Sequence, residues 1–213
     1  MLALFIKYPC IEMNSFFGKK SEANEGPESE KSEEKETNIY RENNHVYFYS
    51  EVNRRTVSLL QICLREAEEY CVIQSLRLRV PVPIYLHIYS DGGYIHAALS
   101  VMDLITCLKA DVYSVIDGAT ASAGTLISIV CKKRYIRPSA YMLIHQLSSS
   151  IWGKMGEIMD EFQNISDLHD KIIEIYAKYS KLTVKKLKKL LKHDLWLNAD
   201  FSMKYGLVDE IYS

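Results

Sequence analysis

Cysteine is sparse in this sequence, and its spacing is unlike that of a metal site or a disulfide framework. The 213-residue chain has five cysteines, and no two of them form a C-x-x-C pair. Structural zinc sites and disulfide-rich domains need paired cysteines at short, regular spacings. We therefore expect no metal, no cofactor and a reducing environment, which means the cytoplasm, or the host cytoplasm if the source is a virus.

The sequence also lacks both an excess of charge and an uninterrupted apolar run. Its net charge of −1 at pH 7 gives no electrostatic reason to bind nucleic acid. Residues 112–131 have the length of a membrane span, but Asp117 and a centre rich in Gly, Ser and Thr favour a buried core. The apolar stretch at residues 1–6 is too short for the core of a secretory signal. We therefore expect neither a nucleic-acid partner nor a membrane partner.

Apolar side chains are almost missing from residues 19–38, which consist mainly of Glu, Lys and Ser. Such a segment cannot bury enough apolar surface to offset the entropy lost on ordering. The chain as a whole is 48% hydrophobic and long enough to build a substantial core. We predict a flexible N-terminal arm at residues 1–38 and one folded domain at residues 39–213.

Hydrophobic spacing in that domain predicts strands that alternate with helices. Short β-branched and aromatic runs indicate strands, and apolar residues three or four positions apart indicate helices. The expected strands cover 46–49, 84–89, 112–116, 141–144 and 207–212, and the expected helices 57–70, 95–108, 125–131, 155–175 and 184–191. Residues 71–83 alternate apolar with polar side chains, which favours an additional strand or hairpin arm. The alternation of strands and helices predicts an α/β fold with parallel pairing.

Turns rich in small residues follow two of these strands, at residues 92–93 and at residues 118–124. Ser122 lies among neighbours too small to cover it, at the start of a helix whose unpaired N–H groups would stabilise an oxyanion. Taken alone, the stretch is explained more simply by a tight helix–sheet crossing that needs small residues. His145 follows another expected strand. Since parallel strands end at one edge of a sheet, Ser122 and His145 could meet there.

Four segments in consistent order resemble the proteolytic subunit of the Clp protease: residues 90–93 (SDGG), 118–124 (GATASAG), 143–146 (LIHQ) and 194–199 (DLWLNA). The similarity extends over residues 46–213. It implies a ClpP/crotonase-like α/β fold of stacked βαβ units with a protruding helix–strand handle. It further implies a self-compartmentalised serine endopeptidase that cleaves peptides or unfolded proteins inside heptameric rings, single or paired, with a Clp-type AAA+ unfoldase as a partner.

The same resemblance assigns roles to individual residues. Ser122 aligns with the nucleophile, His145 with the general base, and Asp194 with the acid that orients the histidine. The backbone N–H groups of Gly93 and Ala123 align with the oxyanion hole. The resemblance implies no metal.

Several positions depart from the family pattern. Residues 148–150 (SSS) replace a glycine-rich strand that helps to bind substrate, and His193 stands where the family has an arginine that pairs across rings. His87 replaces a tyrosine of the surface that receives the unfoldase. Alternative hypotheses are a phage-type head-maturation protease of the same superfamily, a catalytically silent ring subunit, and a crotonase-type acyl-CoA enzyme. The acyl-CoA enzyme is disfavoured, because this sequence has no acidic residue beside Gly93 or Gly124 in the pattern that such chemistry uses.

Overall fold

Strands and helices alternate over much of residues 38–212, as the hydrophobic spacing predicts. These are the residues that our computed structural model describes, so the predicted arm lies outside them, apart from Asn38 at the start of the first strand. The elements are β1 (Asn38–Glu42), β2 (His45–Tyr49), α1 (Arg54–Leu78), β3 (Ile84–Ser90), α2 (Ile95–Cys107), β4 (Val112–Ala121), α3 (Ala123–Ile129), β5 (Lys133–Ile136), β6 (Tyr141–Leu143), α4 (Met155–Tyr179), α5 (Val184–Leu190), β7 (Leu197–Asn198), α6 (Ala199–Tyr205) and β8 (Glu210–Ile211). Within this part of the chain no helix is both long and apolar enough to cross a membrane.

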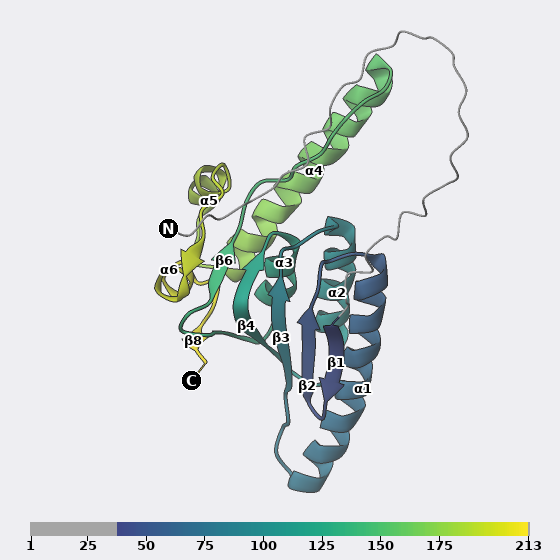
Figure 1. The fold of residues 1–213 in the computed structure, drawn as a ribbon, viewed down its shortest axis with the longest axis vertical. Coiled ribbons are helices and arrows are strands. Elements are labelled where there is room, and N and C mark those ends of the chain that lie inside the picture. The colour runs from purple at the N-terminus through teal and green to yellow at the C-terminus, as the bar shows by residue number, and fades with distance from the viewer. Residues whose placement is uncertain (1–37, 213) are drawn as a thin grey trace, which may run out of the picture. The chain divides into compact units, whose positions relative to one another are not determined.

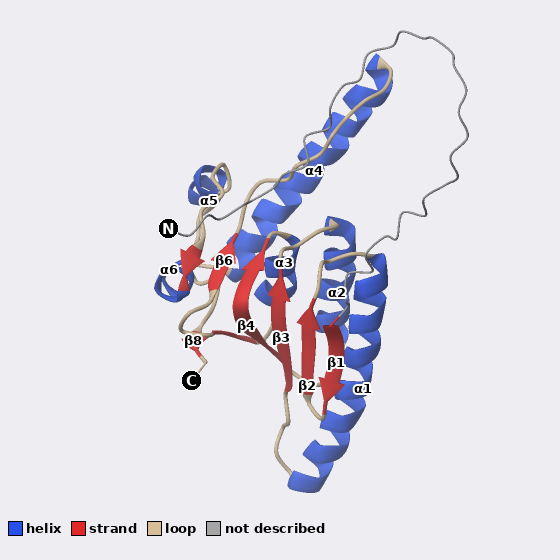
Figure 2. Ribbon diagram, viewed as in Figure 1, coloured by secondary structure: helices blue, strands red, loops and turns tan. Residues whose placement is uncertain are grey.

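An eight-stranded sheet runs through these elements (Figure 1, Figure 2). Its strands follow the order β1-β2-β3-β4-β5-β8, with β6 also paired to β4 and β7 paired to β6. All pairs are parallel except β1 with β2 and β6 with β7. β4 pairs with β5 over residues 113–116 and with β6 over residues 119–121. The parallel strands β3, β4 and β6 therefore end at the same edge of the sheet.

Three helices pack on one face of this sheet (Figure 1). α1 contacts β1, β2 and β3, α3 contacts β3 and β4, and α2 packs against both α1 and α3. Although the buried hydroxyl of Ser114 pairs with that of Ser128 on α3 at 2.8 Å, most strand side chains on this face are apolar and buried, among them Phe48, Ile88 and Ile116. Each such burial contributes roughly 1.5–3 kcal/mol, so this layer fixes the strands whose ends carry the candidate site.

On the opposite face of the sheet, the described residues form a polar network and place no helix over β2, β3 and β4. His87 Nδ1 lies 2.8 Å from Asp117 Oδ2, and Tyr49 and Arg137 each donate to the same carboxylate at 2.8 Å. Burial by itself would raise the pKa of Asp117, but these hydrogen bonds outweigh it and lower the pKa to about 2. His87 also contacts His45 at 3.0 Å and is only 3% exposed, so its ring is committed to the network.

Residues 71–83 are not the strand or hairpin arm that their alternation suggested. α1 continues through Leu78 and ends where Arg79 adopts a left-handed conformation (φ 56°). Cys71 is buried with the rest of the helix stripe, whereas Leu76 and Leu78 are 77% and 61% exposed. The alternating pattern led to a wrong prediction because it included apolar side chains that face solvent near the end of a long helix.

The expected handle has its helix but lacks its strand. The N-terminal part of α4 extends away from the sheet (Figure 1), and its buried residues all lie between Ile172 and Tyr176. Residues 144–152 have no strand pairing. A single extended segment beside a helix has no neighbouring strand to complete its ladder of hydrogen bonds, and even a two-stranded hairpin is only marginally stable on its own.

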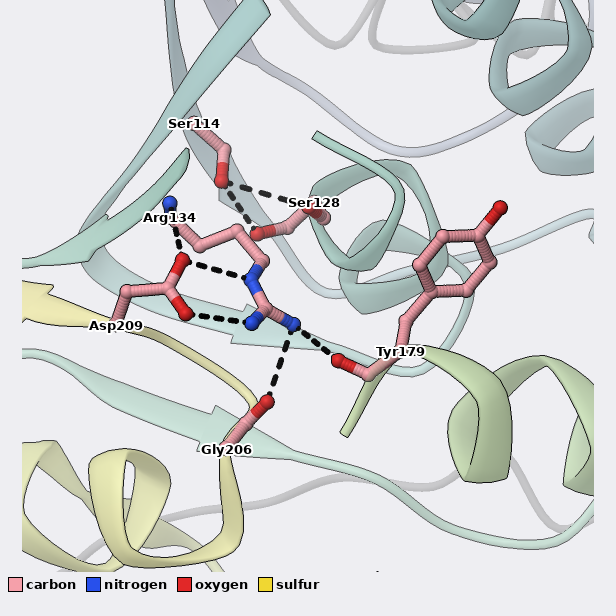
Figure 3. Close-up of polar contacts among 6 residues, drawn as sticks. All are labelled: Ser114, Ser128, Arg134, Tyr179, Gly206 and Asp209. Carbon is pink, nitrogen blue, oxygen red and sulfur yellow. Dashed lines mark hydrogen bonds and ion pairs between the residues drawn. The ribbon is translucent and has the colours of Figure 1, made fainter. Parts of the chain in front are cut away.

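Arg134 on β5 holds the C-terminal segment against the sheet (Figure 3). Its guanidinium donates to both carboxylate oxygens of Asp209, at 3.0 and 2.6 Å. The remaining Nη1 donates to the carbonyl oxygens of Tyr179 at 2.6 Å and Gly206 at 3.1 Å. One side chain therefore joins β5, the end of α4 and the residues after α6.

Candidate active site

Ser122 lies at a sharp turn between β4 and α3. Its backbone has φ 51° and ψ −125°, a conformation that residues other than glycine rarely adopt. The Ser122 N–H donates to the carbonyl oxygen of Leu143 on β6 at 2.8 Å, and the Thr125 hydroxyl donates to the Ser122 carbonyl at 2.6 Å. Neighbouring elements thus fix the strained turn, which presents the Ser122 side chain just beyond the end of β4.

Two positions that follow β3, Gly92 and Gly93, must be glycine because other atoms approach them closely. A Cβ on Gly92 (φ 95°) would lie 2.6 Å from Ser122 Cβ, and one on Gly93 (φ 137°) would lie 2.3 Å from the Val52 carbonyl oxygen. Val52 donates to Gly92 and accepts from Tyr94, both at 2.7 Å. In such a parallel bridge the N–H of the central residue, Gly93, points away from the partner strand. The Gly93 N–H is therefore free to face a ligand.

His145 and Asp194 come from distant parts of the chain and meet beside β6. His145 Nδ1 lies 3.5 Å from Asp194 Oδ1. The Gln146 N–H donates to the Leu191 carbonyl oxygen at 2.8 Å, which ties the end of β6 to the turn that carries Asp194. The His145 side chain is 24% exposed and the Asp194 side chain 70% exposed. The separation of these two atoms is within the range of an ion pair but is longer than a typical N–H···O hydrogen bond.

Four of the five predicted site residues line one cavity of about 370 Å³: Gly93, Ser122, Ala123 and His145. Asp194 contacts His145 from outside the cavity wall. Ala123 is the first residue of α3, so its N–H has no acceptor within the helix. A hydroxyl, an imidazole and two unpaired N–H groups around one space are suited to attack on a carbonyl and to stabilisation of the resulting oxyanion. Within residues 38–212 no cluster of His, Cys, Asp or Glu side chains could hold a metal ion.

Much of the cavity wall comes from residues that the sequence did not single out. Apolar side chains of α3 and α4 form one side: Leu126, Ile165, Leu168, Ile172 and Tyr176. Tyr176 is buried, and its hydroxyl lies 2.5 Å from Thr125 Oγ1; burial raises the pKa of Tyr176. The apolar stripe of α4 correctly indicated an amphipathic helix, but its spacing cannot distinguish a core contact from the wall of a cavity.

Comparison with known proteins gives a consistent result. The family model for Clp protease matches residues 40–213. ATP-dependent Clp protease proteolytic subunit 2 of Treponema denticola is 34% identical over 165 residues, which cover 75% of this chain and 82% of that protein. The chain belongs to the Clp protease family. The subunit 2 of Pseudomonas aeruginosa is 31% identical over 145 residues, or 66% of this chain and 72% of that protein.

The fold of this Clp protease family member agrees with a solved relative. A mutant of ClpP1 from Listeria monocytogenes superposes with a TM-score of 0.69 at 26% identity, over 80% of this chain and 92% of that chain. This confirms the ClpP-like α/β fold expected from the motifs. Family membership supports a ClpP-like serine protease.

Proposed function

We propose that this protein is a serine endopeptidase in which Ser122, His145 and Asp194 form the catalytic triad. The observation that carries the proposal is the common cavity: Ser122 and His145 line it, and Asp194 lies behind His145. The substrates are peptides or unfolded protein segments, as the resemblance to the Clp protease family implies.

The arrangement gives each triad member a defined part in the reaction. Asp194 faces Nδ1 of His145, so Nε2 is the nitrogen available to Ser122. Ser122 Oγ attacks the carbonyl carbon of the peptide bond while His145 Nε2 takes its proton, and His145 then passes that proton to the leaving amine. Water, deprotonated by His145, cleaves the resulting ester and restores the Ser122 hydroxyl. Asp194 holds the imidazole tautomer and stabilises its charged form.

The backbone N–H groups of Gly93 and Ala123 stabilise the negative oxygen of the tetrahedral intermediate. Both residues line the cavity beside Ser122, and neither N–H is used by the local secondary structure. Loss of one such donor typically costs roughly 3 kcal/mol of transition-state stabilisation. Because the donors belong to the backbone, they require glycine or small residues at these positions rather than a particular side chain.

The apolar wall of the cavity selects the substrate side chain next to the cleaved bond. Leu126, Leu168 and Ile172 present hydrocarbon to the space beside Ser122. A large apolar side chain buried there gains roughly 1.5–3 kcal/mol relative to an exposed one. We therefore expect cleavage after large apolar residues in preference to small or charged ones.

A catalytically silent ring subunit is the second candidate. It is favoured by the 3.5 Å separation of His145 and Asp194 and by the 70% exposure of the Asp194 side chain. Catalytic hydrogen bonds are often long before substrate binds, which is why the endopeptidase remains the better-supported function.

Labelling by a fluorophosphonate probe tests the proposal directly. The wild-type protein is expected to react at Ser122 and to hydrolyse a fluorogenic peptide, whereas Ser122→Ala should do neither and should keep the wild-type thermal unfolding curve. His145→Ala should reduce labelling while Ser122 is intact. An unlabelled, inactive wild-type protein would favour the silent subunit, and activity retained in Ser122→Ala would overturn the assignment of the nucleophile.

We also propose that the working form is a homo-oligomeric ring of this chain, heptameric as the family resemblance implies, either single or paired with a second ring. Support comes from α4, where Met155, Met159 and Phe162 are 75%, 58% and 63% exposed along one stripe. Contiguous exposed apolar side chains of this kind typically mark protein contacts. A Clp-type AAA+ unfoldase is proposed as a further partner, and it would meet the open face of the sheet.

A further inference from the structure

A second, basic cavity adjoins the candidate active site. It has a volume of about 380 Å³ and is lined by Gln146, His169, Lys188, Lys189, Leu191 and Lys192. Gln146 also lines the cavity that contains Ser122 and His145. The two cavities therefore share a wall, one residue after the proposed general base.

The charge of this second cavity is poorly balanced. Lys188 lies 3.5 Å from Asp170, but within residues 38–212 neither Lys189 nor Lys192 has an ion-pair partner. α5 and the residues after it contribute three lysines, and the facing part of α4 contributes His169 and Asp170. The cavity lining thus holds three lysines and no carboxylate, and a bound anion would relieve the mutual repulsion of the ammonium groups.

The basic cavity is built from fixed elements. α5 packs against α4, and Leu187 and Leu191 are buried beneath the lysines. The Leu191 carbonyl oxygen accepts the Gln146 N–H at 2.8 Å, so the position of the cavity relative to β6 is set by the backbone. The lysine side chains themselves are exposed, as expected of a solvated helix face, and the cavity lies between them, His169 and Gln146.

We propose that this cavity is a subsite for acidic side chains of the substrate, located within a few residues of the cleaved bond. The inference rests on the proposed endopeptidase function and deepens it. A peptide that extends from Ser122 past Gln146 would bring Asp or Glu side chains to Lys189 and Lys192. The apolar wall would then select the residue at the cleaved bond, and the basic cavity would select an acidic flank.

Paired peptides test this proposal. Both peptides of a pair have the same apolar residue at the cleaved bond, and one carries Asp-Glu-Asp where the other carries Asn-Gln-Asn. In the first pair this segment precedes the cleaved bond, and in the second pair it follows the cleaved bond. For the wild type, we expect that in one of the two pairs KM for the acidic peptide is roughly fivefold lower than KM for its neutral partner. This difference should shrink as the salt concentration is raised. In Lys189→Glu the ratio of the two KM values should fall to about one or invert.

Lys185→Glu is the matched control, because Lys185 carries the same charge on the same helix but does not line the cavity. It should retain most of the wild-type KM ratio. Equal KM values within both pairs for the wild type, or equal losses in Lys185→Glu and Lys189→Glu, would overturn the subsite.

Binding separates this proposal from the endopeptidase activity. Fluorescence anisotropy of the labelled acidic and neutral peptides is measured with Ser122→Ala, alone and combined with Lys189→Glu. Tighter binding of the acidic peptide that disappears with Lys189→Glu supports the subsite even if the wild type cleaves nothing. Indistinguishable binding of the two peptides would reject the subsite even if the wild type is an active peptidase.

Discussion

Single residues in the site hold backbone conformations that most side chains avoid. Ser122 has φ 51°, and Gly92, packed against it, has φ 95°. For a residue other than glycine, such as Ser122, a conformation of this kind costs about 1–3 kcal/mol and persists only where neighbouring contacts fix it. Here those contacts are the hydrogen bond to Leu143 and the close approach of Gly92 to Ser122 Cβ.

Gly92→Ala should therefore disable the site. The new Cβ would lie 2.6 Å from Ser122 Cβ and 2.9 Å from the Ala121 carbonyl oxygen, so the Ser122 turn must move. We expect kcat for a fluorogenic peptide to fall by roughly a hundredfold, because displacement of a reacting group by about 1 Å has effects of this size.

Gly118→Ala is the control for backbone strain alone. Gly118 also has a positive φ, of 65°, but a Cβ there would meet only Tyr89, at 3.5 Å. For the Gly118→Ala variant, the free energy of unfolding should fall by roughly 1 kcal/mol while kcat is retained. Equal loss of kcat in both variants would show that the contact between Gly92 and Ser122 does not position the nucleophile.

At the scale of elements, one arginine joins the last quarter of the chain to the sheet. Arg134 on β5 binds Asp209 in a two-point contact and also two carbonyl oxygens (Figure 3). Bidentate, charge-assisted hydrogen bonds of this type are stronger than single neutral ones. They outweigh the effect of burial and lower the pKa of Asp209. The elements that carry Asp194 and the basic cavity are thereby held near β6.

Arg134→Ala should lower the free energy of unfolding by roughly 2–4 kcal/mol, because it removes the guanidinium that donates to Asp209 and to two carbonyl groups and leaves Asp209 only the backbone N–H of residue 134. Lys132→Ala is the matched control: its pair with Asp111 is exposed, at 67% and 45%. That variant should change stability by less than about 1 kcal/mol. Urea denaturation followed by circular dichroism measures both, and comparable losses would show that the Arg134 contacts add nothing beyond a surface pair.

At the scale of the whole molecule, residues 38–212 leave an apolar stripe of α4 without a covering layer. Met155, Met159 and Phe162 lie on the part of the helix that extends away from the sheet (Figure 1), far from the residues that bury its other end. Among residues 38–212, the side chains of α4 that are buried lie between Ile172 and Tyr176. An additional copy of the chain would complete the layer, which agrees with the proposed ring.

Phe162→Glu should prevent assembly, since it would bury a carboxylate in an apolar contact. Sedimentation velocity should show a large assembly for the wild type and a smaller species for the variant. Asn164→Glu adds the same charge at an exposed polar position of α4 and should sediment as the wild type. If Phe162→Glu also sediments as the wild type, the exposed stripe of α4 is not the assembly surface.

Local sequence pattern by itself determined many of the elements of this protein. The strands at β2, β3, β4 and β6 and the helices α2, α4 and α5 follow from residue spacing, because side-chain periodicity is a local property of the chain. The short motifs around Gly93, Ser122, His145 and Asp194 were sufficient to indicate the family. β1, β5, β7 and α6 were missed because they are short or depend on pairing with distant residues.

Only the tertiary structure decided which of these residues meet. The shared cavity, the contact between His145 and Asp194, and the wall that joins the active site to the basic cavity depend on β4 pairing with β6 and on the hydrogen bond from Gln146 to Leu191. Burial also depends on the complete fold, which is why Leu76 is exposed on α1 whereas His87 is enclosed beside Asp117. Periodicity specifies which face of an element is apolar, and long-range packing specifies what that face touches.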